Sequence, residues 1–333
     1  MFAIVTILTA APLPSRAEWL GARAALAVRR SGRLAAVAGA TLLLFLLSLF
    51  GISSSVPHGA VWMPPFPAGV AALILALFAG FASNLALEIA RPAIATAREA
   101  EQSAGAPLVC MIRVPEGDAI PDRMDPFQML YLGLTATGKR PRTVAIAGDN
   151  RTVVATTAGK LALVAATDTT ATLVVDVDAE GSAIAGYYGL PPEPGFTDAV
   201  AGVRLWREVA RPVGASSGLA IDVVPAGSIR QDVTDPELLR PARSDFAGFR
   251  EQYDLCIMAA PTRIAVDQLG ALIESPMVVV CAVLGQTTAE TLRAATNRLR
   301  TSGASVVGIV LWDGDLPVVQ SRNMLMAKIL GVR

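Results

Sequence analysis

Residues 144–180 constrain the fold of this chain more than any other stretch. They contain an apolar strand at 144–147, a polar loop at 148–151, an alanine-rich helix at 152–166 and a second apolar strand at 173–178. Strand, helix and strand in this order predict a βαβ unit of a parallel sheet. Ligands of such sheets bind beyond the carboxyl ends of the strands, where the polar loop lies.

The polar loop does not carry a phosphate-binding motif. A P-loop, G-x-x-x-x-G-K-[ST], uses glycines so that backbone N–H groups can wrap phosphates, together with a lysine and a Mg²⁺-binding hydroxyl. Gly159 and Lys160 are the nearest match, but the glycine five residues earlier is replaced by Val154. Lys160 also lies about two turns inside the predicted helix. We therefore interpret Gly159 and Lys160 as a pair on the helix surface.

Apolar and helical segments alternate through the rest of the chain. Further strands are expected at residues 108–114, 219–225, 255–260, 277–283 and 306–312, and helices at 88–104, 125–134, from 235 onward, at 288–301, and once in the loop after Asp178. This alternation predicts a doubly wound α/β domain over residues 88–333, with a parallel sheet of about six or seven strands.

Two long uncharged segments precede this domain, at residues 34–52 and 68–87. Each has the length, about 20 residues, that spans the hydrocarbon core of a membrane. The mean hydropathy of +0.51 and the 17% of charged residues make the chain more apolar than an ordinary soluble domain. We expect a two-span transmembrane hairpin over residues 34–87, and a pair of buried core helices is the alternative.

The flanking charges predict the orientation of this hairpin. Arginines precede the first span and follow the second, whereas the connector 53–67 has no lysine or arginine. The positive-inside rule places residues 1–33 and the domain 88–333 in the cytoplasm, with a short outer loop. His58, the only histidine, lies in that loop, so histidine-based catalysis and metal ligation are excluded from the cytoplasmic part. The apolar residues 1–14 remain unassigned.

Net charge and cysteines narrow the classes of function further. The chain has no formal net charge, which argues against nucleic acid as a partner because nucleic-acid-binding proteins show a basic footprint. Cys110, Cys256 and Cys281 fall in or beside predicted strands and form no C-x-x-C pair. They are therefore predicted to be buried, reduced thiols.

An ordered set of segments resembles the bacterial tyrosine kinase (BY-kinase) family fused to polysaccharide co-polymerases. LVVDVD resembles its Walker A′ motif, YYGLPPEPGFTDAVAG its GLSDVL segment, IDVVPAG its PAG turn and YDLCIMAAP its YDxVIIDTPP strand. The match covers about residues 66–315. The resemblance implies a P-loop-NTPase-like fold, ATP and Mg²⁺ as cofactors of active members, and protein-tyrosine kinase activity. It also implies a place in the bacterial inner membrane, in oligomers or hetero-oligomers with co-polymerase, export or kinase subunits of exopolysaccharide biosynthesis.

The positions that handle phosphate in this family are replaced here. Counting back from Asp176, the Walker A lysine matches Val154, the glycines match Arg151 and Val153, and the Mg²⁺-binding hydroxyl matches Ala155. The Walker B carboxylate matches Ala259. The arginine-bearing assembly helix of the family matches Asp125, Gln128 and Tyr131, and the tyrosine-rich tail has no counterpart in residues 314–333. The resemblance therefore implies a degenerate Walker A and Walker B site.

Asp176 and Asp178 retain the Walker A′ pair, which in an active relative holds Mg²⁺-bound water and accepts the substrate proton. Without the lysine, we predict vestigial carboxylates that remain solvated or cap the following turn. Arg151 could replace the lost lysine, although the β-branched residues beside it would obstruct a phosphate. The degenerate nucleotide-binding positions are Gly148, Asn150, Arg151, Thr152 and Thr156.

Three hypotheses follow. The first is a membrane-anchored, catalytically inactive pseudokinase that acts as scaffold or regulator in exopolysaccharide synthesis and export. The second is an active ATPase or kinase with a rearranged site of Arg151, Asp176 and Asp178, with ATP and Mg²⁺ as cofactors. The third is an assembly subunit whose hairpin packs against a partner's spans. Small residues of the second span allow such packing and equally fit lipid-facing sequence: Gly69, Ala72, Ala76, Ala79 and Gly80.

Overall fold

The structure, a computed structural model, describes residues 93–113, 125–135, 143–178, 181–214, 218–228, 236–260, 272–273 and 277–313. The segment 1–33 and the predicted hairpin 34–87 lie outside these residues, so the hairpin remains a prediction. Among the helices that are described, none is long and apolar enough to cross a membrane.

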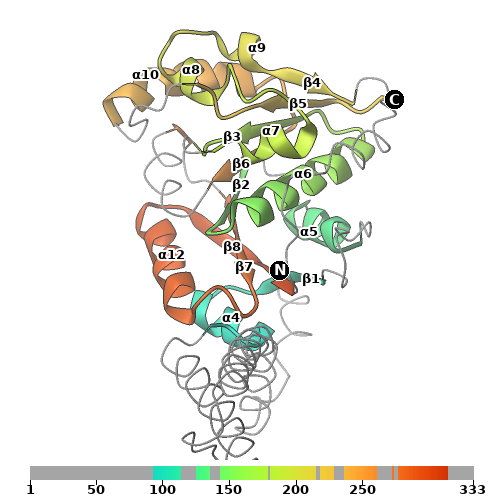
Figure 1. The fold of residues 1–333 in the computed structure, drawn as a ribbon, viewed down its shortest axis with the longest axis vertical. Helices are drawn as coiled ribbons and strands as arrows, with labels where there is room; N and C mark the ends of the chain where they lie inside the picture. The colour runs from blue at the N-terminus through green and yellow to red at the C-terminus, as the bar shows by residue number, and fades with distance from the viewer. Residues whose placement is uncertain are drawn as a thin grey trace, which may run out of the picture. The chain divides into compact units, whose positions relative to one another are not determined.

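An eight-stranded sheet forms the centre of the described domain (Figure 1), in the order β1-β8-β7-β2-β6-β3-β5-β4. Neighbouring strands are parallel except β4 and β5, which are antiparallel. The strands are β1 (Leu108–Arg113), β2 (Thr143–Gly148), β3 (Thr172–Asp176), β4 (Arg211–Val213), β5 (Ile221–Val224), β6 (Leu255–Ala260), β7 (Met277–Val283) and β8 (Ser305–Asp313). The predicted α/β class and parallel sheet are confirmed. The short edge strand β4 is present in the sheet but was not predicted from the sequence.

Helices cover both faces of the sheet (Figure 1). The chain passes from β2 through α6 (Arg151–Thr167) to β3, and from β7 through α12 (Ala289–Thr301) to β8. These two crossovers run in opposite directions along the sheet, so right-handed connections place their helices on opposite faces. α5 (Asp125–Thr135) and α7 (Ala183–Tyr188) pack against α6, and α4 (Ala97–Ala104) packs against α12. Three further helices are α8 (Phe196–Val200), α9 (Trp206–Val209) and α10 (Pro236–Arg250).

Two helix predictions need correction. Of the helix expected at 88–104, residues 97–104 are helical and residues 93–96 are not, while residues 88–92 lie outside the described part of the chain. The loop after Asp178 was expected to hold one short helix, but it holds α7 and α8. Glycine and proline divide that segment into two short helices.

α6 is buried on almost every side. Its side chains from Val153 to Ala166 are buried, which confirms the buried face expected for Val153, Leu161 and Val164. The helix packs against β2, β3 and β6 on one side and against α5 and α7 on the others. A helix that is apolar nearly all round belongs in the interior.

The interpretation of Gly159 and Lys160 as a surface pair is wrong. Lys160 is 1% exposed. A Cβ atom at Gly159 would lie 2.3 Å from Cε1 of Tyr187, and the Tyr188 hydroxyl donates a 3.2 Å hydrogen bond to the Gly159 carbonyl oxygen. Both tyrosines belong to α7, which covers this face of α6. Gly159 therefore serves helix packing and binds no phosphate.

The three cysteines are buried, free thiols, as predicted. They lie in β1, β6 and β7. Burial raises the pKa of Cys110, Cys256 and Cys281 to about 12. The thiolate, which is the reactive form, is therefore suppressed at neutral pH.

Candidate functional site

The carboxyl ends of β2, β6 and β3 meet at one edge of the sheet, which is where ligands of parallel sheets bind. Ala259 of β6 is the register partner of Ile146 in β2 and of Asp176 in β3. The position expected for the Walker B carboxylate thus lies beside the first Walker A′ aspartate. The methyl group of Ala259 can neither bind a metal nor accept a proton.

The connection between β2 and α6 consists of two residues, Asp149 and Asn150. Asn150 caps the helix: its Oδ1 accepts a hydrogen bond from the Val153 N–H at 3.2 Å, and its carbonyl accepts from the Val154 N–H at 3.0 Å. A P-loop instead inserts several residues here, and their N–H groups surround the phosphates. This connection is too short to form such a cradle, and Asn150 already accepts hydrogen bonds from the N–H groups of Val153 and Val154.

Gly148, the last residue of β2, is needed for packing. A Cβ atom there would lie 2.9 Å from the carbonyl oxygen of Cys281 in β7 and 3.1 Å from Cγ2 of Val154. A glycine is required for this close approach, and no bound phosphate has to be invoked.

The other degenerate positions point mostly into the core. Val154 and Ala155, which stand where the lysine and the hydroxyl are expected, are each 3% exposed and belong to the main hydrophobic cluster. Thr156 is equally buried, and Thr152 is half-buried. Of these positions, Arg151 is the one whose charged side chain reaches the aspartates.

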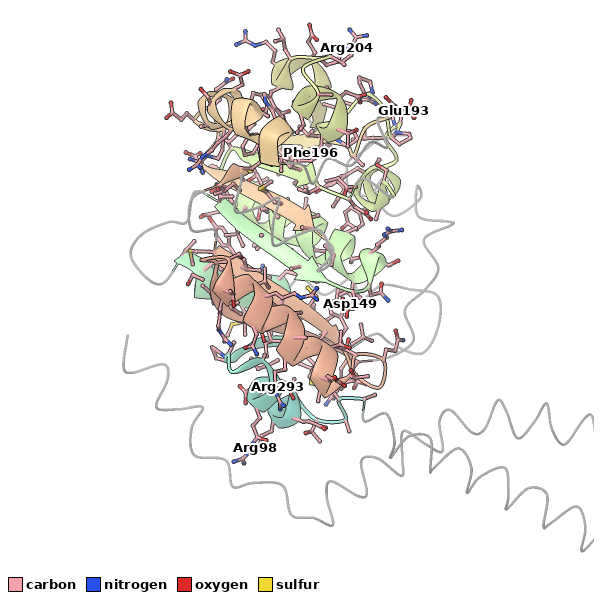
Figure 2. All side chains as sticks on the ribbon, turned by 90° about the vertical axis from the view of Figure 1, so that its left-hand side faces the viewer. Arg98, Asp149, Glu193, Phe196, Arg204 and Arg293 are labelled. Carbon is pink, nitrogen blue, oxygen red and sulfur yellow. The ribbon has the colours of Figure 1, made fainter. Side chains whose placement is uncertain are left out.

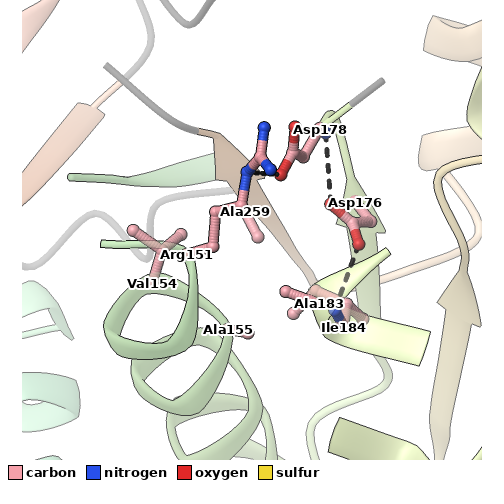
Figure 3. Close-up of a pocket in the computed structure, with 8 residues that line it drawn as sticks. All are labelled: Arg151, Val154, Ala155, Asp176, Asp178, Ala183, Ile184 and Ala259. Atoms are coloured by element: carbon pink, nitrogen blue, oxygen red, sulfur yellow. Dashed lines mark hydrogen bonds and ion pairs between the residues drawn. The ribbon is translucent and has the colours of Figure 1, made fainter. Parts of the chain in front are cut away.

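Asp176 and Asp178 are 1% and 3% exposed. The Oδ1 atom of Asp176 accepts a 3.1 Å hydrogen bond from the Asp178 N–H, and its Oδ2 atom accepts one of 3.1 Å from the Ile184 N–H at the start of α7 (Figure 3). Of the two predicted environments, the solvated one is wrong, because α7 closes over the strand end. The turn-capping role predicted for Asp176 is what the structure has.

Arg151 and Asp178 form an ion pair across the site. The Arg151 Nε atom lies 2.6 Å from Oδ2 of Asp178 and joins the first residue of α6 to the end of β3 (Figure 3). The Asp178 side chain is 4% exposed and the Arg151 side chain 41%. The guanidinium group of Arg151 therefore balances the charge of the buried Asp178 carboxylate.

A small cavity remains between these groups (Figure 3). The volume open to the centre of a water molecule is about 10 Å³, which is room for roughly one water. A nucleotide triphosphate does not fit. Ala183 and Ile184 of α7 contribute to the cavity wall. Both are ordinary apolar residues, so the sequence gives no signal that they belong to the site. The full lining is Arg151, Val154, Ala155, Asp176, Asp178, Ala183, Ile184 and Ala259.

Burial raises the pKa of Asp176 to about 7. The two backbone hydrogen bonds and the positive charge of Arg151 oppose this rise, and the negative charge of Asp178 adds to it. The folded state therefore holds a proton on Asp176 at mildly acidic pH, where the unfolded state has lost it.

The contribution of Asp176 to the stability of the domain should fall as the pH rises from about 4 to about 7. The folded-state pKa of Asp176 is raised above its unfolded value, so its contribution is fully present at acidic pH and is lost as the pH rises through about 7. Between pH 5 and pH 8 we expect wild type to lose roughly 2–3 kcal/mol more than Asp176→Asn, because about two pH units separate pH 5 from the folded-state pKa and each corresponds to about 1.4 kcal/mol. Thermal unfolding of the full chain in detergent measures this. Parallel pH profiles of the two proteins would contradict the raised pKa.

The α5 positions that match the family's assembly helix are divided between surface and interior. Asp125 and Gln128 are exposed, whereas Tyr131 is 7% exposed. The Tyr131 hydroxyl donates a 3.0 Å hydrogen bond to Oδ2 of Asp168 and lies 3.2 Å from Oγ1 of Thr170. Tyr131 therefore fixes α5 to the end of α6.

Comparison with known proteins shows which fold this is. No protein-family model and no curated protein matches the chain. Among solved structures, the kinase domain of the Escherichia coli tyrosine kinase ETK superimposes with a TM-score of 0.57 at 20% identity, over 68% of this chain and 98% of that one. The BceF tyrosine kinase domain gives 0.56 at 16% identity, over 66% and 99%. The chimerical protein CapA2B2 gives 0.56 at 18% identity, over 65% and 98%.

The chain has the fold of a bacterial tyrosine kinase domain. The resemblance to BY-kinases drawn from the sequence is thereby confirmed at the level of fold. Nearly the whole of each kinase domain is matched, whereas the match leaves about a third of this chain uncovered. Identities this low establish the BY-kinase fold and leave the activity to be argued from the site.

Proposed function

We propose that this chain is a membrane-anchored, catalytically inactive relative of the BY-kinases. It acts as a scaffold or regulator in the synthesis and export of exopolysaccharide or capsular polysaccharide. The observation that carries this proposal is the connection of two residues between β2 and α6, which leaves no loop to hold the phosphates of a nucleotide.

The chemistry of the site supports inactivity. Phosphoryl transfer depends almost entirely on positioning and on cations that stabilise the developing charge. At the three positions expected to supply a cation, a hydroxyl and a carboxylate stand Val154, Ala155 and Ala259. Arg151 remains, but it is paired with Asp178, so a nucleotide would have to break that pair.

The sequence supports the membrane and partner parts of the proposal. The predicted hairpin 34–87 anchors the domain to the bacterial inner membrane with both termini in the cytoplasm. Partners would be the polysaccharide co-polymerase, export or kinase subunits of the same assembly, bound in an oligomer or hetero-oligomer. A regulator that transfers no phosphate can act only through such contacts.

One observation favours an alternative, an active ATP-dependent kinase or ATPase with a rearranged site. Arg151 is partly exposed and close to both aspartates, so it could bind a phosphate if α7 moved away. Asp176 would then accept the proton of the substrate hydroxyl. This function requires Mg²⁺–ATP to open the ion pair of Arg151 with Asp178.

Phosphate transfer distinguishes the two functions. We expect the full chain, incubated in detergent with radiolabelled ATP and Mg²⁺, to incorporate no more label than its Asp176→Ala variant. The same preparation should be folded by circular dichroism, so that inactivity is not caused by unfolding. Autophosphorylation that disappears in Asp176→Ala would establish the alternative.

A further inference from the structure

The helix α7 closes a site in which negative charge exceeds positive charge. It covers the end of β3, where the carboxylates of Asp176 and Asp178 are 1% and 3% exposed. The neighbouring cation is Arg151, whose side chain is 41% exposed and therefore partly in water. When both carboxylates are ionised, two buried negative charges lie beside one positive charge that water screens. Closing α7 over this site is therefore easier when one carboxylate carries a proton.

Among the described residues, Arg151 and Asp178 are the charged groups that face Asp176. The side chains packed around the two carboxylates come from three elements: Arg151, Val154 and Ala155 of α6, Ala259 of β6, and Ala183 and Ile184 of α7. Asp149, in the connection between β2 and α6, is exposed and does not line the cavity (Figure 2). In the described part of the chain, no three Asp, Glu, His or Cys side chains come together as a metal site. Burial outweighs the hydrogen bonds and Arg151 and raises the pKa of Asp176 to about 7, so Asp176 is the carboxylate that takes up the proton.

A small number of contacts holds α7 in the closed position. At its start, the Ile184 N–H donates a 3.1 Å hydrogen bond to Oδ2 of Asp176. At its end, the Tyr188 hydroxyl donates a 3.2 Å hydrogen bond to the Gly159 carbonyl oxygen of α6, and the ring of Tyr187 packs against the same glycine. The helix has six residues and lies outside the sheet. Its separation from α6 and β3 therefore leaves the strands paired, as in the local openings that hydrogen exchange detects in proteins.

Glycines lie at both ends of α7. Gly189 is its C-cap, with a φ of +69°. Gly181 lies two residues before the helix, and a Cβ atom there would be 3.4 Å from Nη1 of Arg151 and 3.6 Å from Oδ2 of Asp178. Glycine backbone can absorb the changes in φ and ψ that a hinge requires. The segment that carries α7 therefore packs closely against the ion pair when closed and has a hinge residue on either side.

Opening and protonation are linked at this site. Opening α7 brings Asp176 into water, where the pKa of an aspartate is about 4. The closed form has the raised pKa, so Asp176 favours the closed form fully at acidic pH, and this preference is lost as the pH rises through about 7. Between these two pKa values, each pH unit raises the population of the open form by up to about ten-fold.

We propose that α7 is a pH-sensitive cover of the strand ends, which takes up a proton on Asp176 when it closes and opens more often as the pH rises toward neutral. Opening exposes Asp176 and the face of α6 around Gly159, while the central sheet stays folded. This device goes beyond the proposed function and does not rest on it, because it needs neither a nucleotide nor a partner.

Hydrogen exchange of the full chain in detergent tests this cover. Protection factors of peptides from α7 and from β6 are measured at pH 5 and pH 7, after correction for the intrinsic pH dependence of exchange. We expect α7 to be at least about ten-fold less protected than β6 at both pH values, because α7 opens without the sheet. We also expect the protection of α7 to fall by at least about ten-fold from pH 5 to pH 7. These two comparisons need only the wild-type chain.

Two matched variants assign the pH dependence to Asp176. Asp176→Asn removes the titrating group and keeps its shape, so the protection of α7 should change by less than about two-fold between pH 5 and pH 7. Asp245→Asn, the same change at an exposed aspartate of α10, should retain the fall seen in wild type. The proposal is overturned by equal protection of α7 and β6, by protection of α7 that does not fall in wild type, or by a fall that Asp176→Asn retains.

Discussion

Replacing Asp198 with alanine should lower the free energy of unfolding by about 3–5 kcal/mol. Asp198 is 4% exposed. Its Oδ2 atom accepts hydrogen bonds from the Gly195 N–H at 2.7 Å and the Ser228 N–H at 3.1 Å, and its Oδ1 atom accepts one from the Ser228 hydroxyl at 2.6 Å. Burial opposes its ionisation, but the hydrogen bonds from Ser228 and Gly195 outweigh burial and lower its pKa. Alanine would leave these donors without their acceptor.

The surroundings of Asp198 leave no space for another residue to take over. A Cβ atom at Gly195 would lie 2.2 Å from the Pro225 carbonyl oxygen, and one at Gly227 would lie 2.3 Å from Oγ1 of Thr197. Gly227 also has a φ of +99°, which favours glycine. The start of α8 and the turn after β5 therefore touch backbone to backbone, and the Asp198 carboxylate joins them.

Chemical denaturation of the full chain in detergent, followed by hydrogen exchange of peptides from α8 and β5, measures the loss. Asp245→Ala is a matched control, because Asp245 is an exposed aspartate of α10 and its removal should change stability by less than about 0.5 kcal/mol. Equal effects of the two substitutions would show that the hydrogen bonds of Asp198 contribute nothing net.

Removing Arg151 should cost about 1–3 kcal/mol. The substitution Arg151→Met leaves the Asp178 carboxylate, which is 4% exposed, without the cation at 2.6 Å. A buried charge that loses its partner costs about 3–5 kcal/mol, and the lower figure applies because the arginine side chain is 41% exposed and thus partly screened by solvent. Asp178→Asn alone removes the same pair from the other side.

A double-mutant cycle isolates this pair. The combined variant Arg151→Met with Asp178→Asn should be more stable than the sum of the single effects predicts, by about 1–2 kcal/mol. Arg298→Met, at an exposed arginine of α12, gives the effect of losing an unrelated positive charge. Strict additivity of the two single substitutions would mean that the ion pair does not stabilise the closed site.

The sheet could be predicted from the sequence because its central strands are uninterrupted apolar runs. Those of β3 and β6 are buried at every residue, and such runs leave little doubt about their place in a parallel sheet. β4 escapes prediction because it has three residues, one of them Pro212. α7 cannot be predicted because its glycine and two tyrosines form no helical pattern. Without α7, nothing in the sequence indicates that the α6 face bearing Lys160 is covered.

The replacement of the Walker A and Walker B residues could be predicted, because motif spacing fixes the positions at which these residue types are expected. The structure adds that Ala259 lies beside Asp176 in the sheet register. The ion pair of Arg151 with Asp178 and the capping of Ile184 by Asp176 could not be derived, because both depend on how α7 packs over the strand end. The packing of α7 over the end of β3 also buries Asp176 and Asp178, so the prediction that these carboxylates remain solvated is wrong.

Equilibrium titration of the full chain with a fluorescent ATP analogue in the presence of Mg²⁺ tests the central claim most directly. With the site closed by its own arginine and no phosphate loop, we expect no saturable binding up to millimolar analogue, for wild type and for Arg151→Met alike. Saturable binding with a micromolar dissociation constant, weakened by Arg151→Met and by Asp178→Asn, would contradict the account.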